Sequence, residues 1–152
     1  LTAGAMIEVP AAALMADTIM PHLDFVSIGT NDLTQYTMAA DRLSPQLAYL
    51  TDPWQPAVLR LIQHTCVVGR DNNVPVGVCG EAAADPMLAC VLTGLGVTSL
   101  SAASTAVAGV GAQLAELTLE QCQKMAEAAI NAESPADARS AVIALLEEYQ
   151  TA

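Results

Sequence analysis

The sequence predicts an α/β fold in which short parallel strands alternate with helices. Four short apolar runs, at residues 5–9, 25–28, 76–79 and 98–102, are each followed by a segment with helical features. Strands that alternate with helices pair in parallel, because each helix carries the chain back to the start of the next strand. The runs are apolar throughout, which is typical of strands buried on both faces. We therefore expect four strand–loop–helix units and two further helices.

The first two units show clear start and stop signals. The strand at residues 5–9 ends at Pro10, which suits the first position of a helix because the N–H it lacks has no partner there. The strand at residues 25–28 is closed by Gly29-Thr30-Asn31-Asp32, and a helix starts near Leu33. A proline-containing loop follows. A long helix then runs from about residue 57 to 69, with apolar side chains at spacings of three and four.

The last two units and the C-terminus follow the same logic. Gly80-Glu81 closes the third strand, and Asp85-Pro86 supplies a helix cap followed by proline at the first helical position. The fourth strand precedes a helix of small residues that runs to about Leu117. Thr118 with Gln121 fits a capping box for the next helix. We expect residues 1–117 to form the strand-containing body and residues 118–152 to form C-terminal helices packed on the same domain.

Two parallel architectures fit this order of elements: a small doubly wound sheet and part of a (β/α)₈ barrel. A whole barrel takes about 250 residues, or about 31 for each unit. Four units take roughly 125 residues. The 152 residues can therefore hold half a barrel with extra helices, and they cannot hold a full one. Length alone does not choose between the two architectures.

Charge and cysteine content exclude several classes of partner. Lysine and arginine number 5 against 16 acidic residues, a net charge of −11, and the basic residues are not clustered. Nucleic acids and anionic membrane surfaces both require clustered cations. No apolar run reaches the roughly 18 residues of a membrane span. Because no basic segment precedes the first apolar run, we expect no signal peptide. The four cysteines have no zinc-site spacing. We expect a cytoplasmic protein with reduced thiols: Cys66, Cys79, Cys90 and Cys122.

Polar residues that do not suit a core lie where the predicted strands end. Glu8 lies at the end of the first strand, Asn31 and Asp32 follow the second, and Cys79 and Glu81 close the third. In parallel α/β sheets this edge binds ligands. Each residue also has a structural explanation when it is taken alone. Asp32 suits a helix cap and Cys79 suits a small buried side chain.

Taken together, the same residues predict a phosphate site. Glu8 and Asp32 are two carboxylates on different strand ends, a donor set that suits Mg²⁺ bound together with a substrate phosphate. Arg42 can close on that phosphate, although its neighbour Asp41 is the more usual partner for such an arginine. The thiol of Cys79, at the end of the third strand, can donate or accept a proton at the same site. We expect His22 and His64 to be structural or solvated.

Three ordered segments resemble the phosphoenolpyruvate-utilising enzymes. The segment at residues 4–12 (GAMIEVPAA) resembles the fifth-strand motif of that family. Residues 27–37 (SIGTNDLTQYT), with Asp41-Arg42, resemble the sixth, and residues 77–81 (GVCGE) resemble the seventh. Within the family the chain is most similar to enzyme I of the bacterial sugar phosphotransferase system. Pyruvate phosphate dikinase and phosphoenolpyruvate synthase are the alternatives, and Gln35-Tyr36-Thr37 favours enzyme I.

The resemblance implies strands five to eight of a TIM barrel that binds phosphoenolpyruvate. It implies that Glu8 and Asp32 are Mg²⁺ ligands and that Asn31 and Arg42 hold the phosphate, with Asp32 also in the substrate site. It further implies that Cys79 protonates the enolate of pyruvate at carbon three, and that Gly80 lets the backbone come close to the substrate. After the fourth strand, residues 104–109 (STAVAG) depart from the proline and basic residues that the family usually has there.

The resemblance also places some parts of the machinery outside these residues. The family's phosphorylated histidine, which passes the phosphoryl group to a histidine-containing phosphocarrier protein, lies on a separate N-terminal domain. The first four strands carry further arginines of the phosphate clamp. We therefore expect a fragment of a longer chain that is inactive alone and forms a homo-oligomer. The alternative of a different class is a non-enzymatic dimerisation fragment.

Overall fold

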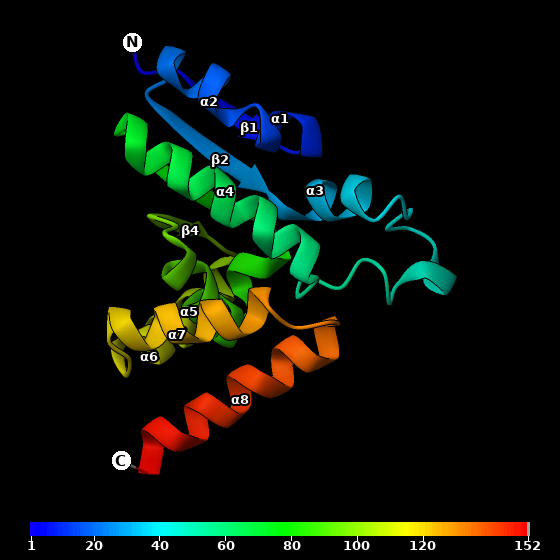
Figure 1. Ribbon diagram of the computed structural model, residues 1–152, viewed down its shortest axis with the longest axis vertical. Coiled ribbons are helices and arrows are strands. Elements are labelled where there is room, and N and C mark those ends of the chain that lie inside the picture. Colours follow the sequence, from blue (N-terminus) through cyan, green and yellow to red (C-terminus); the bar gives the residue numbers. More distant parts are fainter. Residues whose placement is uncertain (152) are drawn as a thin grey trace.

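The computed structural model describes residues 1–151 and contains one parallel sheet (Figure 1). The strands β1 (Gly4–Ile7), β2 (Phe25–Gly29), β3 (Val76–Cys79) and β4 (Ser99–Ser101) follow one another in the order β1-β2-β3-β4. Every neighbouring pair is parallel. The α/β class and all four predicted strands are therefore confirmed, within a few residues at their ends.

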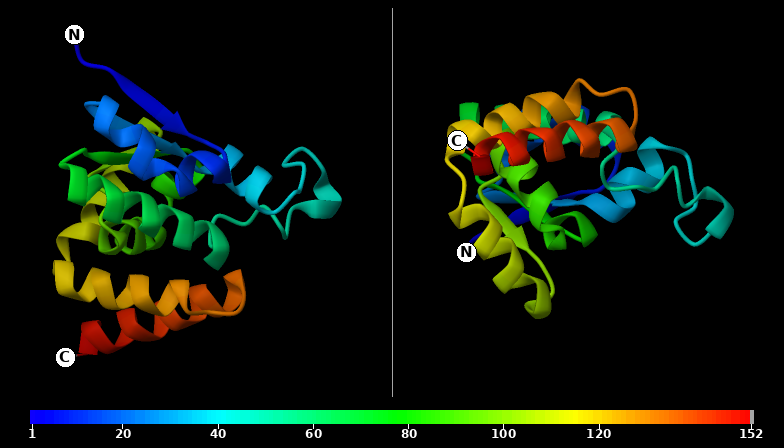
Figure 2. Two further views of the ribbon diagram at one scale, coloured as in Figure 1. Left: turned by 45° about the horizontal axis from the view of Figure 1, so that its top comes forward. Right: turned by 90° about the horizontal axis from the view of Figure 1, so that it is seen from below.

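Helices and short 3₁₀ turns connect the strands. Between β1 and β2 lie α1 (Pro10–Leu14), α2 (Ala16–Ile19) and η1 (Met20–His22). Between β2 and β3 lie α3 (Thr30–Thr37), η2 (Pro45–Leu47) and α4 (Pro56–Asn72). The turn η3 (Glu81–Ala84) and α5 (Pro86–Leu95) lead to β4, and α6 (Ser104–Ala115), α7 (Leu119–Ile130) and α8 (Pro135–Thr151) complete the described chain. Figure 2 shows α7 and α8 lying side by side, while the connection between α3 and α4 projects from the body.

Two helix boundaries differ from the sequence prediction. The first helix is divided at Met15, whose backbone dihedrals of φ −98° and ψ 21° interrupt the helical path. The helix after β2 begins at Thr30 and not at Leu33, so Asn31 and Asp32 lie in its first turn. This second difference matters for the site, because the first turn of a helix fixes side chains more firmly than a loop does.

The two faces of the sheet have different environments. The side chains on one face are at most 1% exposed and join the core with residues of α4 and α5: Ile7, Val26, Ile28, Val76 and Val78. On the opposite face Met6 and Phe25 are exposed by 46% and 42%. The prediction of strands buried on both faces was wrong for this second face, where the small and polar neighbours of Met6 and Phe25 do not cover them. In register with Met6 it holds Ser27, Gly77 and Ser99.

These observations decide between the two predicted architectures. A doubly wound sheet reverses its strand order at a switch point and is covered by helices on both faces. Here the strand order follows the chain without reversal, and only one face is buried against helices. Both features are typical of a segment of a (β/α)₈ barrel, in which helices surround the outside. The structure is consistent with a partial barrel.

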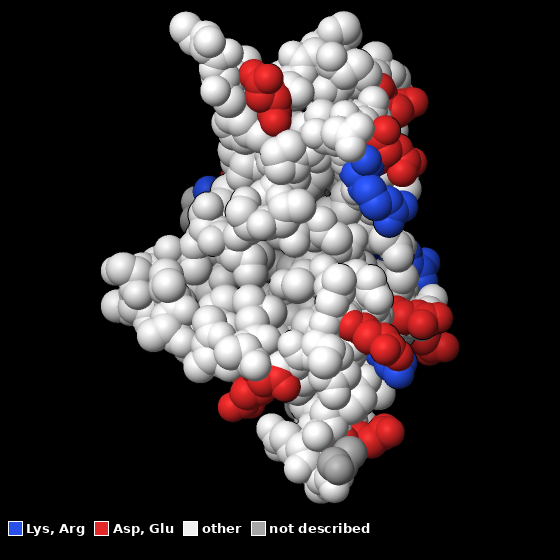
Figure 3. All heavy atoms as spheres, turned by 90° about the vertical axis from the view of Figure 1, so that its left-hand side faces the viewer, with Lys and Arg blue, Asp and Glu red and all other residues white. Residues whose placement is uncertain are grey.

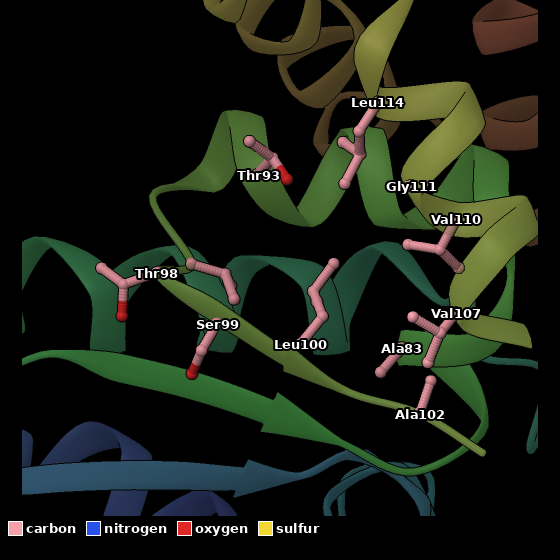
Figure 4. Close-up of a pocket in the computed structure, with 11 residues that line it drawn as sticks. Ala83, Thr93, Thr98, Ser99, Leu100, Ala102, Val107, Val110, Gly111 and Leu114 are labelled. Carbon is pink, nitrogen blue, oxygen red and sulfur yellow. The ribbon is translucent and has the colours of Figure 1, made fainter. Parts of the chain in front are cut away.

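Both outer strands of the sheet have an open edge, since β1 pairs only with β2 and β4 only with β3. Next to the β4 edge lies an apolar pocket of about 340 Å³. In Figure 4 its walls are Leu100 and Ala102 on one side and Val107, Val110 and Leu114 of α6 on the other. No charged residue occurs between residues 86 and 115. Figure 3 shows the side of the molecule that is on the left in Figure 1. The centre of this side is uncharged, and most of its charged residues lie along the right-hand margin.

The long connection between α3 and α4 is fastened by Trp54, which is fully buried. Its indole N–H donates to the Asp85 carboxylate at 3.1 Å, and that carboxylate also caps α5 by accepting the backbone N–H groups of Met87 and Leu88. The guanidinium of Arg139 in α8 lies 5.3 Å from the centre of the indole ring and donates to Asp52 at 3.3 Å. One tryptophan therefore joins the connection, α5 and α8.

Replacing Asp85 should lower stability through both of its roles. In Asp85→Ala, α5 loses its cap and a buried indole N–H loses its acceptor, so we expect the free energy of unfolding to fall by about 2 kcal/mol. Urea unfolding followed by circular dichroism measures the change. Asp71→Ala is the control, because Asp71 is exposed and its only ion pair is with the adjacent Arg70. Equal stability losses in the two variants would contradict the capping role.

Candidate functional site

The carboxyl ends of β1, β2 and β3 surround a cavity of about 160 Å³. All of the residues predicted from the sequence to bind substrate, metal or protons line it: Glu8, Asn31, Asp32, Arg42, Cys79 and Gly80. Gly29 and Thr30 complete the lining. The structure therefore brings together residues that lie up to 72 positions apart in the sequence, from Glu8 to Gly80 (80 − 8 = 72).

The other polar candidates lie elsewhere. Glu81 lines a neighbouring hollow of about 420 Å³, which shares Asn31 and Arg42 with the cavity and also contains Thr51. His22 in η1 and His64 in α4 are exposed and line neither space.

The Glu8 carboxylate is directed toward the end of β2. A Cβ atom built on Gly29 would come within 2.7 Å of Glu8 Oε1, so the carboxylate lies directly over the glycine. A side chain at position 29 would force the Glu8 carboxylate to move. Asp32 lies in the first turn of α3 just beyond the same strand end, where the partial positive charge of a helix N-terminus stabilises a carboxylate. The two acidic side chains thus approach one cavity from two strand ends.

Arg42 folds back from the connection after α3 onto this edge. Its guanidinium nitrogen lies 3.5 Å from Asp32 Oδ1, and its backbone N–H donates to the Gln35 side chain at 3.2 Å. Asp41 does not pair with it and instead accepts the backbone N–H of Leu43. The Arg42 and Asp32 side chains are 45% and 35% exposed, so their ion pair adds little stability and leaves the guanidinium available to an anion.

The end of β3 is held against the end of β2. The Cys79 sulfur lies 3.6 Å from the backbone carbonyl oxygen of Ile28, and the Thr30 hydroxyl donates to the Cys79 carbonyl at 3.0 Å. Gly80 then turns the chain with φ 104°, a conformation that favours glycine. The Asn31 side-chain oxygen accepts the backbone N–H of Glu81 at 3.2 Å. This contact leaves the amide NH₂ of Asn31 as a donor for an anionic ligand.

Sequence reasoning missed Gly29 and Thr30 as lining residues. A glycine at the end of a strand is a recognised signal of close approach by another group, and Gly29 could have been found in this way. Thr30 gives no comparable signal, because threonine is common both in strands and at helix starts. Its burial, 2% exposed at a strand end, becomes visible only in three dimensions.

The residues of the cavity fit Mg²⁺ better than other common metals. Among residues 1–151 no group of three or more His, Cys, Asp or Glu side chains is placed to hold a metal ion. Zinc and calcium sites require larger sets of protein ligands. Mg²⁺ instead keeps several waters and accepts one or two carboxylates together with phosphate oxygens. Glu8 and Asp32 match that requirement in number and in ligand type.

The thiols differ in their access to solvent. Cys66, Cys90 and Cys122 are buried, whereas Cys79 is partly exposed. Burial raises the pKa of Cys66 and of Cys90 to about 12 and also raises the pKa of Cys122. Thiolate is the reactive form, so the three buried thiols are inert at neutral pH.

Alkylation should therefore select Cys79. When the folded chain is treated with iodoacetamide, we expect modification at Cys79 to exceed that at the other cysteines by about tenfold or more. Between pH 7 and pH 9 the buried thiols should stay unmodified, since a pKa of about 12 keeps Cys66 and Cys90 protonated over that range. Peptide mass spectrometry with an unfolded control measures each site. Equal modification of Cys66 and Cys79 in the folded state would contradict the placement.

The helices of the described residues include none that is both long and apolar enough to cross a membrane.

Comparisons with known proteins point to one family over most of the chain. Residues 1–119 match the family described as "PEP-utilising enzyme, PEP-binding domain". The chain is 52% identical over 143 residues to the "Phosphoenolpyruvate-protein phosphotransferase" of Streptomyces coelicolor and 44% identical over 128 residues to that of Geobacillus stearothermophilus. It is 47% identical over 140 residues to the "Multiphosphoryl transfer protein" of Xanthomonas campestris pv. campestris.

These alignments cover 94%, 84% and 92% of this chain but only 26%, 22% and 17% of the three relatives. The chain thus spans about a quarter of their length or less. The matched segment contains every residue that lines the cavity. The chain belongs to the phosphoenolpyruvate-utilising enzymes, through their phosphoenolpyruvate-binding domain.

Proposed function

We propose that the chain forms the C-terminal half, strands five to eight, of a barrel that binds phosphoenolpyruvate in a phosphotransferase. The phosphoryl group would pass to a protein histidine on another domain and then to a histidine-containing phosphocarrier protein. The convergence of two carboxylates, an arginine, an asparagine and a thiol on one cavity of about 160 Å³ carries this proposal. The matched segments of relatives named as phosphoenolpyruvate-protein phosphotransferases support the choice of acceptor.

Arg42 and Asn31 would hold the phosphate group. The guanidinium offers a planar pair of donors that matches phosphate oxygens, and the free amide NH₂ of Asn31 adds a third. Arg42 must exchange its contact with Asp32 for the ligand, which the exposure of that pair allows. Gly80 lines the cavity at the end of β3, and its backbone would contact the substrate there.

Cys79 would act on the carbon end of the substrate. When the phosphoryl group leaves, the remaining enolate needs a proton at carbon three to become pyruvate. The thiol S–H bond supplies that proton, and the resulting thiolate regains a proton from water before the next turnover. A thiol that lines the cavity meets the geometric requirement for such an acid.

Glu8 and Asp32 would hold Mg²⁺, which when bound offsets negative charge on substrate oxygens. Their own contribution is to fix its place beside the phosphate-binding donors. Phosphoryl transfer depends mainly on positioning and charge neutralisation. The two carboxylates and Arg42 would therefore make most of the contribution of this chain to the rate of transfer.

A chimera tests the proposed function directly. The matching 143 residues of the Streptomyces coelicolor relative would be replaced by those of this chain. The chimera should form pyruvate from phosphoenolpyruvate and label its histidine with ³²P in the presence of Mg²⁺. A chimera that folds and dimerises, judged by circular dichroism and sedimentation, but transfers no phosphoryl group would instead favour the non-enzymatic alternative.

Asp32→Asn in the chimera should lower Mg²⁺-dependent turnover by about 100-fold or more, since the metal loses a charged ligand. Circular dichroism should show that the fold is retained. Asp41→Asn is the matched control, because Asp41 lies on the same connection as Arg42 and its carboxylate accepts the backbone N–H of Leu43 instead of pairing with Arg42. Normal turnover of Asp32→Asn at limiting Mg²⁺ would show that the ligand assignment is wrong.

We also propose that the 152-residue chain alone self-associates. Its β1 and β4 edges have no strand partner, and unpaired parallel edges recruit other strands. In a closed barrel those edges would pair with the other four strands. The exposed Met6 on the helix-free face and the apolar pocket beside β4 add surface that favours burial.

Sedimentation velocity should show a dimer or larger assembly whose population rises with concentration. Met6→Lys should shift the chain toward monomer, because a charge on the face beside the β1 edge opposes burial. Met15→Lys is the control, since Met15 is 52% exposed at the junction of the first two helices and belongs to no strand. A monomer at all concentrations would contradict the proposed self-association.

A further inference from the structure

We infer that Thr30 is a positioning residue for Cys79, a role that rests on the proposed function of the thiol as a proton donor. Thr30 is the first residue of α3, directly after β2, and is 2% exposed. Its hydroxyl donates to the backbone carbonyl of Cys79 at 3.0 Å. The contact joins two neighbouring strand ends at the residue that bears the thiol.

This hydrogen bond holds the backbone of Cys79, and the backbone of a residue determines where its side chain can point. Cys79 is the last residue of β3, and Gly80 turns the chain away with φ 104°. A Cβ built on Gly80 would lie 2.7 Å from the Thr30 hydroxyl oxygen, so that hydroxyl occupies the space beside the glycine. The Thr30 hydroxyl therefore contacts both the Cys79 carbonyl and the turn at Gly80. The thiol itself lies over β2, 3.6 Å from the Ile28 carbonyl oxygen.

Another buried threonine on the same helix shows what is specific to Thr30. Thr34 is also 2% exposed, and its hydroxyl donates at 2.7 Å to the Thr30 carbonyl, within α3. Loss of the Thr34 hydroxyl removes a hydrogen bond inside one helix. Loss of the Thr30 hydroxyl removes a hydrogen bond between two strand ends. Thr30→Val and Thr34→Val are thus matched in burial and chemistry, and only the first touches Cys79.

Thiol reactivity measures the position of Cys79 without any requirement for catalysis. In the 152-residue chain, Thr30→Val should raise the iodoacetamide alkylation rate of Cys79 by about fivefold, because the strand end loses its anchor. Thr30→Ser, which keeps the donor, and Thr34→Val should both stay within about twofold of the parent. An unchanged rate in Thr30→Val, or an equal increase in Thr34→Val, would overturn the inference.

Kinetics in the Streptomyces coelicolor chimera give a second readout. Thr30→Val should lower the single-turnover rate of pyruvate formation by about tenfold, with little change in KM for phosphoenolpyruvate, and Thr30→Ser should restore the rate. A raised KM with an unchanged rate would assign Thr30 to substrate binding and overturn the positioning role. If Cys79→Ala leaves the rate unchanged, the proposed acid fails. The alkylation series still decides whether Thr30 positions the thiol.

Discussion

The site depends on the parallel pairing of β1, β2 and β3. Ile7 pairs with Ile28, and Gly29 pairs with Cys79, so the next residues of all three strands emerge at one edge of the sheet. Glu8 and Cys79 can therefore approach the same cavity from either side of β2, although they lie 71 positions apart (79 − 8 = 71). Gly29 at the centre has no side chain to separate them, and the Glu8 carboxylate occupies the space above it. The burial of Ile7, Ile28 and Val78 against the helices holds this register in place.

The charged side chains at the carboxyl ends of the strands lie close together but stay partly exposed to solvent. Asp32 and Arg42 form a partly exposed ion pair, which can open for a ligand at small cost. Arg42 lies on the connection between α3 and α4. The contacts of Trp54 fasten the far end of that connection to α5 and α8. Although the chain has a net charge of −11, it can thus present the guanidinium of Arg42 to an anionic substrate.

Much of the fold and most of the cavity could be predicted from the sequence. Polar residues at strand ends identified the lining, since parallel pairing alone brings such residues together. The exposure of the helix-free face, which carries Met6, was missed. Four-residue strands such as Gly4–Ile7 are too short to reveal an alternation of buried and exposed side chains. The ion pair of Arg42 with Asp32 was missed because the chain turns back after α3 and brings Arg42 to Asp32 instead of to the adjacent Asp41. Thr30 was missed because its role comes from a strand end 49 positions away.

We propose that this edge of the sheet binds an enolate and that Cys79 is its acid. Single-turnover formation of pyruvate in deuterated solvent, in the chimera and its Cys79→Ala variant, tests it most directly. We expect Cys79→Ala to bind phosphoenolpyruvate still but to form pyruvate about 10²–10⁴-fold more slowly, because a positioned acid is lost. Deuterium should also enter carbon three without facial selectivity. An unchanged rate with unchanged stereochemistry would contradict the account and leave the thiol as a packing residue.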